Sequence, residues 1–210
     1  MALSLSKLFY NCTHIKYTHA GLSADYAIRK CKDTLYIYFQ GSDGKIDWKN
    51  NFDFPAKAYK RMGVTVWFAH RGFLKVWKSI EDLILPHILD TSLDKIVICG
   101  YSHGASLALL CHELVWYRRP DLRDNIFGFG FGSPRVLWGP RFKFITKRWE
   151  SFTVIRNIDD LVTHVPPAFL GYYHPTPVFK IGKKGKYSRI DAHRDYNILA
   201  ELEGIDFEGL

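Results

Sequence analysis

Short β-branched runs alternate with longer segments of helical periodicity along this chain. Such runs predict strands over residues 24–30, 34–40, 64–68, 94–99, 126–131 and 152–156; the first two form a predicted hairpin, and the last three are predicted to be buried. Apolar positions at helical spacing predict a helix over residues 71–89, good helix formers predict one over residues 103–119, and the segments near 141–149 and 192–202 are also interpreted as helices. Because strands and helices alternate through the middle of the chain, we expect an α/β fold in which helices flank a largely parallel central sheet.

Length and charge narrow the class of protein. The 210 residues, 47% of them hydrophobic, suffice for one compact domain over residues 1–210. The formal charge of +8 favours transient contact with anionic surfaces such as acidic lipid headgroups. The basic residues are scattered, and no zinc-type pairing, aromatic RNA-binding signature or helix-turn-helix pattern accompanies them. A nucleic-acid partner is therefore not expected.

The cysteines and the N-terminal segment bear on the compartment. The chain has four cysteines, at positions 12, 31, 99 and 111. Their wide spacing favours reduced thiols, with a Cys12–Cys31 disulfide as the alternative. Lys7 interrupts the apolar length that a signal peptide needs, and no later segment has transmembrane length without charges. The expected location is therefore the cytoplasm.

The pentapeptide Gly100-Tyr101-Ser102-His103-Gly104 lies between the apolar run 94–99 and a helical segment. A sharp strand-to-helix turn at Ser102 would expose the hydroxyl and hold the backbone in a strained conformation. Gly100 and Gly104 have the minimal side chains that let the strand and the helix pass closely. This context predicts Ser102 as the nucleophile of a serine hydrolase.

A serine nucleophile needs an imidazole to take its proton and a carboxylate to orient that imidazole. On a sheet of this type the chain order is serine, then acid, then histidine. Asp159 and Asp160 follow the predicted strand 152–156, so either carboxylate would lie at the same sheet edge as Ser102. The remaining downstream aspartates fit less well, because they lie at the opposite edge or start the last helix: Asp121, Asp124, Asp191 and Asp195.

Three histidines follow these aspartates: His164, His174 and His193. His193 is the preferred base, because the short loop 190–193 enters the last helix, from where an imidazole can return over the serine. His174 is the second candidate, although its aromatic neighbours are more typical of a structural hydrogen bond.

Acyl transfer also needs N–H groups that point at the developing oxyanion. His103, the residue after the nucleophile, supplies one backbone N–H at the helix start, and a loop after an early strand must supply the second. Ser42 follows the predicted strand 34–40 and Gly41, so it is the candidate for the second donor. On local sequence alone, an ordinary glycine-rich turn is the simpler interpretation of this segment.

Further motifs make a family resemblance specific. Besides the serine pentapeptide they are Tyr38-Phe39-Gln40-Gly41-Ser42, Asp47-Trp48 with Asn51, His70-Arg71-Gly72-Phe73, Gly132-Ser133-Pro134-Arg135, Asn157 through Asp160-Leu161-Val162, and Pro166-Pro167. In their order along the chain, these motifs resemble the class 3 (fungal-type) lipases over most of residues 24–200. The resemblance implies an α/β-hydrolase fold.

The resemblance also assigns roles to residues by position. The nucleophile falls on Ser102, the acid on Asp160 and the base on His193. The oxyanion donors fall on Ser42 and His103. The acid is thus the second of two adjacent aspartates, a choice that chain order alone leaves open.

Two further histidines match the family outside the triad, and at two places the chain differs from the family pattern. His70 and His174 match family positions that we interpret as structural. Gln40 stands where the family usually has arginine, so the ion pair that this arginine would make behind the site is not expected. Residues 42–51 are short and polar where the family often has an amphipathic lid helix, so we expect a minimal lid.

The leading hypothesis is a serine carboxylic-ester hydrolase, a lipase or esterase, that cleaves acyl esters of lipids through an acyl-enzyme. No metal or organic cofactor is implied, because the protein supplies the oxyanion donors. The alternatives are a phospholipase A-type or thioesterase activity, and a non-catalytic binding module on a hydrolase fold.

Overall fold

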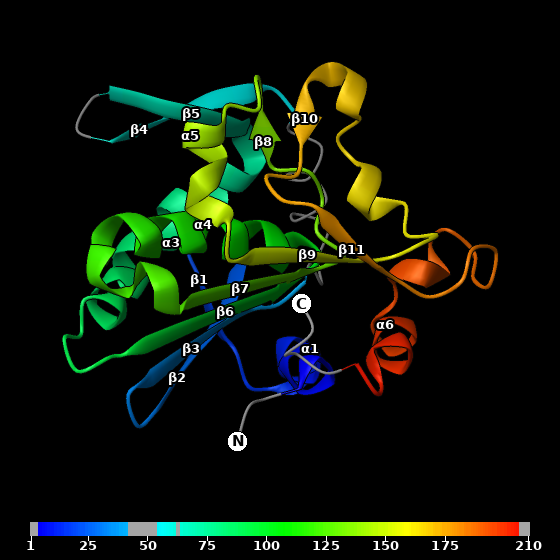
Figure 1. Cartoon of the computed structure of the whole chain (residues 1–210), viewed down its shortest axis with the longest axis horizontal. Helices are drawn as coiled ribbons and strands as arrows, with labels where there is room; N and C mark the ends of the chain where they lie inside the picture. The colour runs from blue at the N-terminus through cyan, green and yellow to red at the C-terminus, as the bar shows by residue number, and fades with distance from the viewer. Residues whose placement is uncertain (1–3, 42–53, 62–63, 206–210) are drawn as a thin grey trace.

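The computed structural model describes residues 4–41, 54–61 and 64–205 (Figure 1). Its centre is a seven-stranded sheet in the order β1-β2-β3-β6-β7-β9-β11. These strands span Thr18–Ala20, Ala24–Cys31, Thr34–Phe39, Lys95–Tyr101, Ile126–Phe131, Phe152–Asn157 and Val178–Ile181. The first three strands are antiparallel, and the sheet is parallel from β3 to β11. The predicted α/β fold with a largely parallel sheet is confirmed.

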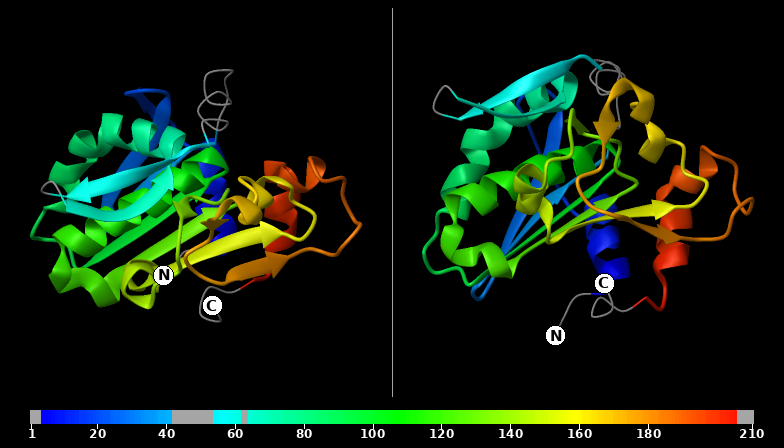
Figure 2. Two further views of the ribbon diagram at one scale, coloured as in Figure 1. Left: turned by 90° about the horizontal axis from the view of Figure 1, so that it is seen from above. Right: turned by 45° about the horizontal axis from the view of Figure 1, so that its top comes forward.

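Helices cover both faces of this sheet and create two separate cores (Figures 1 and 2). The helices are α1 (Leu5–His14), α3 (Arg71–Ile88), α4 (His103–Arg118) and α6 (Asp195–Leu202). Successive side chains of a strand point to opposite faces. In β6, Ile96 and Ile98 join the core beneath α3 and α4, whereas Val97 and Cys99 join the core beneath α1 and α6.

A second, antiparallel sheet in the order β10-β8-β5-β4 lies at the top of Figure 1. Its strands are Tyr172–Tyr173, Leu137–Trp138, Val64–His70 and Ala56–Arg61. Only β5 is predicted from the sequence. Strand β4 carries one large buried ring, Tyr59, which stacks on Trp67 of β5 at a centroid distance of 4.2 Å. Its other positions include Lys57 and Lys60, so the apolar run that signals a buried strand is missing.

Other elements differ from the sequence prediction in extent. The predicted helix 141–149 consists of the short α5 (Lys143–Thr146) followed by a 3-10 turn, η2 (Lys147–Trp149). The last predicted helix begins with the 3-10 turn η5 (Asp191–His193), and α6 follows it. Helix α1 and strand β11 are not predicted, although the buried positions of α1 do recur at helical spacing.

The four cysteine thiols are free, and Cys12, Cys99 and Cys111 are buried. The alternative Cys12–Cys31 disulfide is therefore not formed. Within the described ranges, no helix combines the length and the apolar character needed to cross a membrane.

Buried histidines make the stability of the fold sensitive to pH. His112 lies inside α4 with no exposed surface, and its Nε2 is 3.1 Å from Ser151 Oγ. Burial lowers the pKa of His112 to about 3, and burial likewise lowers the pKa of His103 and of His174 to about 4. As the pH falls below about 6.5, the unfolded chain binds protons at these three histidines, whereas the folded chain keeps them neutral until the pH approaches their lowered pKa values. The free energy of unfolding therefore decreases as the pH falls.

We expect His112→Gln to flatten this pH dependence. Between pH 6 and pH 4 His112 stays neutral in the folded chain and contributes up to about 1.4 kcal/mol of lost stability per pH unit, a contribution that the variant lacks. Urea unfolding at a series of pH values measures the slope. His87→Gln, at an exposed position of α3, is the control and should keep the original slope. Equal slopes for both variants would contradict a neutral buried His112.

Candidate active site

Ser102 lies at the turn between β6 and α4, with φ +55° and ψ −122°. This is a backbone conformation that residues other than glycine rarely adopt. A Cβ on Gly100 would lie 2.2 Å from the carbonyl oxygen of Gly104, and a Cβ on Gly104 would lie 2.2 Å from that of Gln40. Glycine is therefore required on both sides of Ser102, because strand and helix run too close for any side chain.

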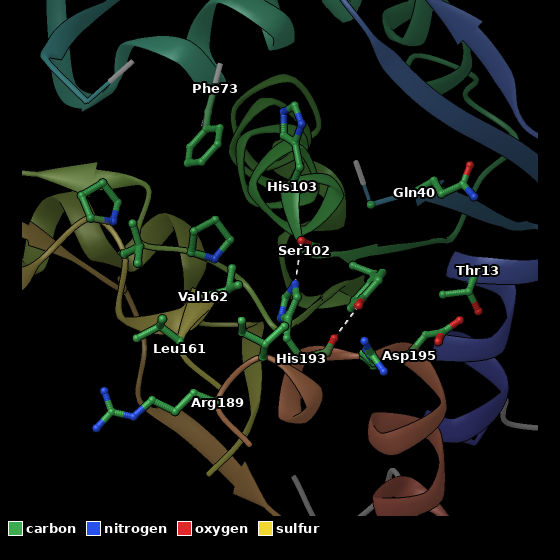
Figure 3. Close-up of a pocket in the computed structure, with 17 residues that line it drawn as sticks. Thr13, Gln40, Phe73, Ser102, His103, Leu161, Val162, Arg189, His193 and Asp195 are labelled. Atoms are coloured by element: carbon green, nitrogen blue, oxygen red, sulfur yellow. Dashed lines mark hydrogen bonds between the residues drawn. The ribbon is translucent and has the colours of Figure 1, made fainter. Parts of the chain in front are cut away.

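A chain of hydrogen bonds joins Ser102, His193 and Asp160. His193 Nε2 is 2.8 Å from Ser102 Oγ (Figure 3), and His193 Nδ1 is 2.9 Å from Asp160 Oδ2. The second carboxylate oxygen of the fully buried Asp160 accepts the N–H of Val162 at 2.8 Å. With the carboxylate holding the proton on Nδ1, Nε2 is the nitrogen that can accept the serine proton.

The other candidates for acid and base contact different partners. Asp159 accepts the backbone N–H of Gly185 at 2.6 Å. His174 is buried, and its Nε2 donates to the carbonyl of Thr163 at 3.0 Å, which fits the structural role that its surroundings suggest. Asp160 and His193 are thus the aspartate and the histidine in the hydrogen-bond chain of Ser102, whereas Asp159 and His174 are not part of it.

Gly132 makes room for this hydrogen-bond chain. Its φ is +59°, and a Cβ there would lie 2.8 Å from Cε1 of His193 and 3.0 Å from Oδ2 of Asp160. The segment 132–135 contributes to the family resemblance, but nothing in its sequence indicates that the glycine faces the imidazole. The contact is visible only once the chain is folded.

The backbone N–H of His103 lies in the first turn of α4, where helix geometry directs N–H groups and a partial positive charge toward the N-terminal end. A developing oxyanion on a substrate bound at Ser102 would face this end. Gly41 lies close by, since a Cβ on it would be 3.3 Å from Ser102 Cβ. Ser42, the other predicted oxyanion donor, and the predicted minimal lid over 42–51 lie outside the described residues.

Tyr101 supports the candidate base, a role that the sequence does not suggest. Its ring stacks on the His193 imidazole at a centroid distance of 5.3 Å, and its hydroxyl donates to the His193 carbonyl at 2.5 Å. Phe9 of α1 also contacts this ring, in a T-shaped arrangement with a centroid distance of 5.4 Å. Burial, together with the nearby Asp195 and Asp160, raises the pKa of Tyr101, so its hydroxyl stays a donor.

We expect Tyr101→Phe to lower kcat for ester turnover by about fivefold while KM changes little. The variant keeps the stacked ring and loses one buried hydrogen bond, which is worth about 1 kcal/mol and fixes the backbone that carries the imidazole. Steady-state kinetics on a soluble ester measure the effect. Tyr17→Phe is the matched control, because the Tyr17 hydroxyl also donates to a backbone carbonyl, that of Asn11 at 2.8 Å, and is not part of the cavity. Equal kcat values in the two variants would contradict the positioning role.

A cavity of about 830 Å³ opens beside Ser102 (Figure 3). In Figure 3, Phe73, Leu161 and Val162 lie on one side of Ser102 and His193, which we call the apolar wall, with the Arg189 side chain beyond them. Thr13, Gln40 and Asp195 lie on the other side, the polar wall. The lining also includes Pro134, Val165, Pro166, Ile190 and Arg194. Among the described residues, no group of three or more histidine, cysteine or acidic side chains is placed to hold a metal ion.

A positive-φ serine between β6 and α4, hydrogen-bonded to a histidine that in turn contacts a buried aspartate, has the geometry typical of a serine-hydrolase site on an α/β fold. The family model for class 3 lipases, "Lipase (class 3)", matches residues 36–170. This match covers more than half of the chain, which therefore belongs to the class 3 lipase family.

Known members of the family differ in length from this chain. A lipase of Rhizomucor miehei is 29% identical over 147 residues, which are 67% of this chain and 40% of that protein. A secreted mono- and diacylglycerol lipase of Fusarium solani is 26% identical over 167 residues, 77% of this chain and 48% of that protein. The structure of Rhizomucor miehei triacylglyceride lipase superposes with a TM-score of 0.69 at 24% identity, covering 81% of this chain and 67% of that chain. The chain thus spans less than half the length of these two curated relatives.

Proposed function

We propose that this chain is a serine carboxylic-ester hydrolase, a lipase or esterase, that cleaves acyl esters of lipids through an acyl-enzyme. The observation that carries the proposal is the continuous hydrogen-bond chain from Asp160 through His193 to Ser102, at the mouth of a cavity with an apolar wall. Membership of the class 3 lipase family supports it.

In the proposed reaction, Ser102 Oγ attacks the ester carbonyl carbon while His193 Nε2 accepts the hydroxyl proton. Asp160 holds the imidazole and stabilises its positive charge. The carbonyl oxygen, now an oxyanion, receives hydrogen bonds from the His103 N–H and, by family resemblance, from Ser42. The imidazolium then protonates the leaving alkoxide, which departs as an alcohol. Water attacks the acyl-enzyme along the same proton route and releases the fatty acid.

The division of the cavity supports a lipid ester as substrate. An acyl chain gains free energy by burying its surface against the apolar wall. The hydroxyl or headgroup side of an ester can bond to the polar wall that Thr13, Gln40 and Asp195 contribute. Relatives named as triacylglyceride and mono- and diacylglycerol lipases point to acylglycerols. A phospholipid acyl ester presents the same bond, so phospholipase A-type activity is the second candidate.

The test combines covalent labelling with a substrate panel. A fluorophosphonate probe should label the folded protein once, on Ser102, as located by peptide mass spectrometry. Turnover should be measured on nitrophenyl esters of increasing chain length, on tri- and monoacylglycerol, on a phospholipid and on an acyl thioester. A folded protein that neither reacts with the probe nor cleaves any of these substrates would refute the proposal and favour a binding module.

A further inference from the structure

An aromatic and basic surface covers the outer side of the second sheet and the start of α5. We call it the aromatic–basic patch and define it by four rings and three cations: Phe68, Trp138, Phe142, Phe144, Arg141, Lys143 and Lys147. The rings expose 40%, 38%, 50% and 70% of their surfaces in that order. Large rings usually lie buried, so four exposed rings on neighbouring elements indicate an interaction site.

The rings form two pairs. Phe142 and Phe144 stack at a centroid distance of 5.4 Å, and Phe68 meets Trp138 edge to face at 5.7 Å. The strand alternation explains the second pair, because Leu137 and other inward residues of β5 and β8 are buried while Phe68 and Trp138 face outward. Each pair presents a larger apolar surface than a single exposed ring would.

The segment that carries three of these rings also has an excess of positive charge. Residues 134–149 contain five arginines and lysines and no aspartate or glutamate. Two of these cations hold the fold together: Arg135 donates to the Pro166 carbonyl at 2.9 Å, and Arg148 Nε lies 3.5 Å from Glu113. The other three are exposed: Arg141 and Lys143 alternate with Phe142 and Phe144, and Lys147 follows Phe144 by three positions.

The patch continues toward the candidate active site. Phe169 and Leu170, which are 87% and 46% exposed, follow the cavity residue Pro166 by only three and four positions. Trp138 Nε1 donates to the Leu170 carbonyl at 2.9 Å, so the outer face of β8 adjoins this segment. Three residues span about 10 Å at most, which places an exposed apolar surface next to the cavity wall.

We propose that the aromatic–basic patch docks the protein on an anionic phospholipid surface. Aromatic rings insert at the boundary between headgroups and acyl chains, and nearby lysines and arginines attract acidic headgroups. A second copy of the chain fits the patch less well, because a symmetric contact would oppose its own cations. A nucleic acid could stack on the rings but would gain nothing from the adjoining Leu170. The proposal rests on the proposed function, since a lipid substrate would then be reached from the docked state.

Co-sedimentation with vesicles tests the docking. The full chain carrying Ser102→Ala, which cannot consume lipid by the proposed reaction, is mixed with phosphatidylcholine vesicles or with vesicles in which phosphatidylglycerol replaces a quarter of the lipid. We expect stronger binding to the second kind, weakened by salt. Adding Lys143→Gln with Lys147→Gln should weaken anionic binding by about 30-fold, roughly fivefold per lysine. Adding Phe142→Ser with Phe144→Ser should weaken binding to both kinds of vesicle by about tenfold or more.

Matched controls separate the patch from general surface properties. Leu83→Ser, at a side chain of α3 that is 49% exposed, and the pair Lys75→Gln with Lys184→Gln should bind vesicles like the parent. The patch variants, made with Ser102 intact, should keep their turnover of a soluble nitrophenyl ester. That turnover tests the proposed function by itself, so failed docking and failed catalysis are distinguishable.

Three results would overturn the docking proposal. The first is equal vesicle binding by the patch variants and the controls. The second is a parent dimer in analytical ultracentrifugation that the paired phenylalanine substitutions disperse while vesicle binding is absent. The third is binding of a fluorescent single-stranded oligonucleotide that depends on Lys143 and Lys147 in a protein that does not bind anionic vesicles.

Discussion

Replacing Ser102 with alanine is expected to lower kcat for ester turnover by about a millionfold and to abolish labelling by a fluorophosphonate probe. The expected effect is this large because Ser102 Oγ is the atom that forms the acyl bond, and His193 Nε2, 2.8 Å away, has no other hydroxyl to activate in that hydrogen-bond chain. Steady-state turnover of a nitrophenyl ester and gel-based labelling measure the two losses. Circular dichroism should show that the variant remains folded, since the substitution removes a single oxygen atom.

Ser106→Ala is the matched control for this loss. Ser106 lies one turn further along α4, is fully buried and is not among the cavity residues. Its alanine variant should label and turn over esters like the parent protein. Turnover that survives in Ser102→Ala would refute the acyl-enzyme mechanism, whatever the control shows.

Asp160→Asn is expected to lower kcat by about ten-thousandfold with little change in KM. An asparagine at this position fits the space of the carboxylate but carries no charge to stabilise the imidazolium. It can also turn its amide nitrogen toward His193 Nδ1, which would favour the imidazole tautomer with the proton on Nε2. That tautomer cannot accept the serine proton. A pH profile of kcat and of the labelling rate measures the effect.

Asp159→Asn tests the choice between the two adjacent aspartates. The Asp159 carboxylate accepts the Gly185 N–H in a surface loop, and an asparagine oxygen can accept the same bond. Its kcat should stay within about twofold of the parent value, as expected for a surface substitution. If the two variants lose kcat equally, or if Asp159→Asn loses more, the assignment of Asp160 as the orienting acid is wrong.

The parallel half of the fold is predictable because its signals are local. Strands such as β6 and β7 are continuous apolar runs, α3 shows strong periodicity over more than four turns, and α4, which is buried on all sides from His103 to Val115, consists largely of good helix formers. In the second sheet only β5 is predictable in this way. Strands β8 and β10 contain two residues each and exist only because they pair with each other and with β5. Pairing between distant segments leaves no periodic signal in either segment.

The same distinction applies to the site. Ser102 has a local signature, because its turn requires glycines at fixed offsets. The two partners that the structure brings to it depend on chain order and family resemblance for their selection, since Asp159 and Asp160 are indistinguishable by local sequence. Gly132 and Tyr101 act through contacts with His193 that join segments 61 and 92 positions apart in the chain. Contacts of this kind arise only in the folded chain.

Ser102 and His193 lie 91 residues apart in the chain, so this pair forms only when a long loop closes. Closing so long a loop depends on the sheet and on α1 and α6, which pack side by side beneath it (Figure 1). A chain that has formed only the turn between β6 and α4 carries a hydroxyl without a proton acceptor and should be chemically inert. An organophosphorus reagent would then label Ser102 only in fully folded molecules. The time course of labelling during refolding would report the final folding step.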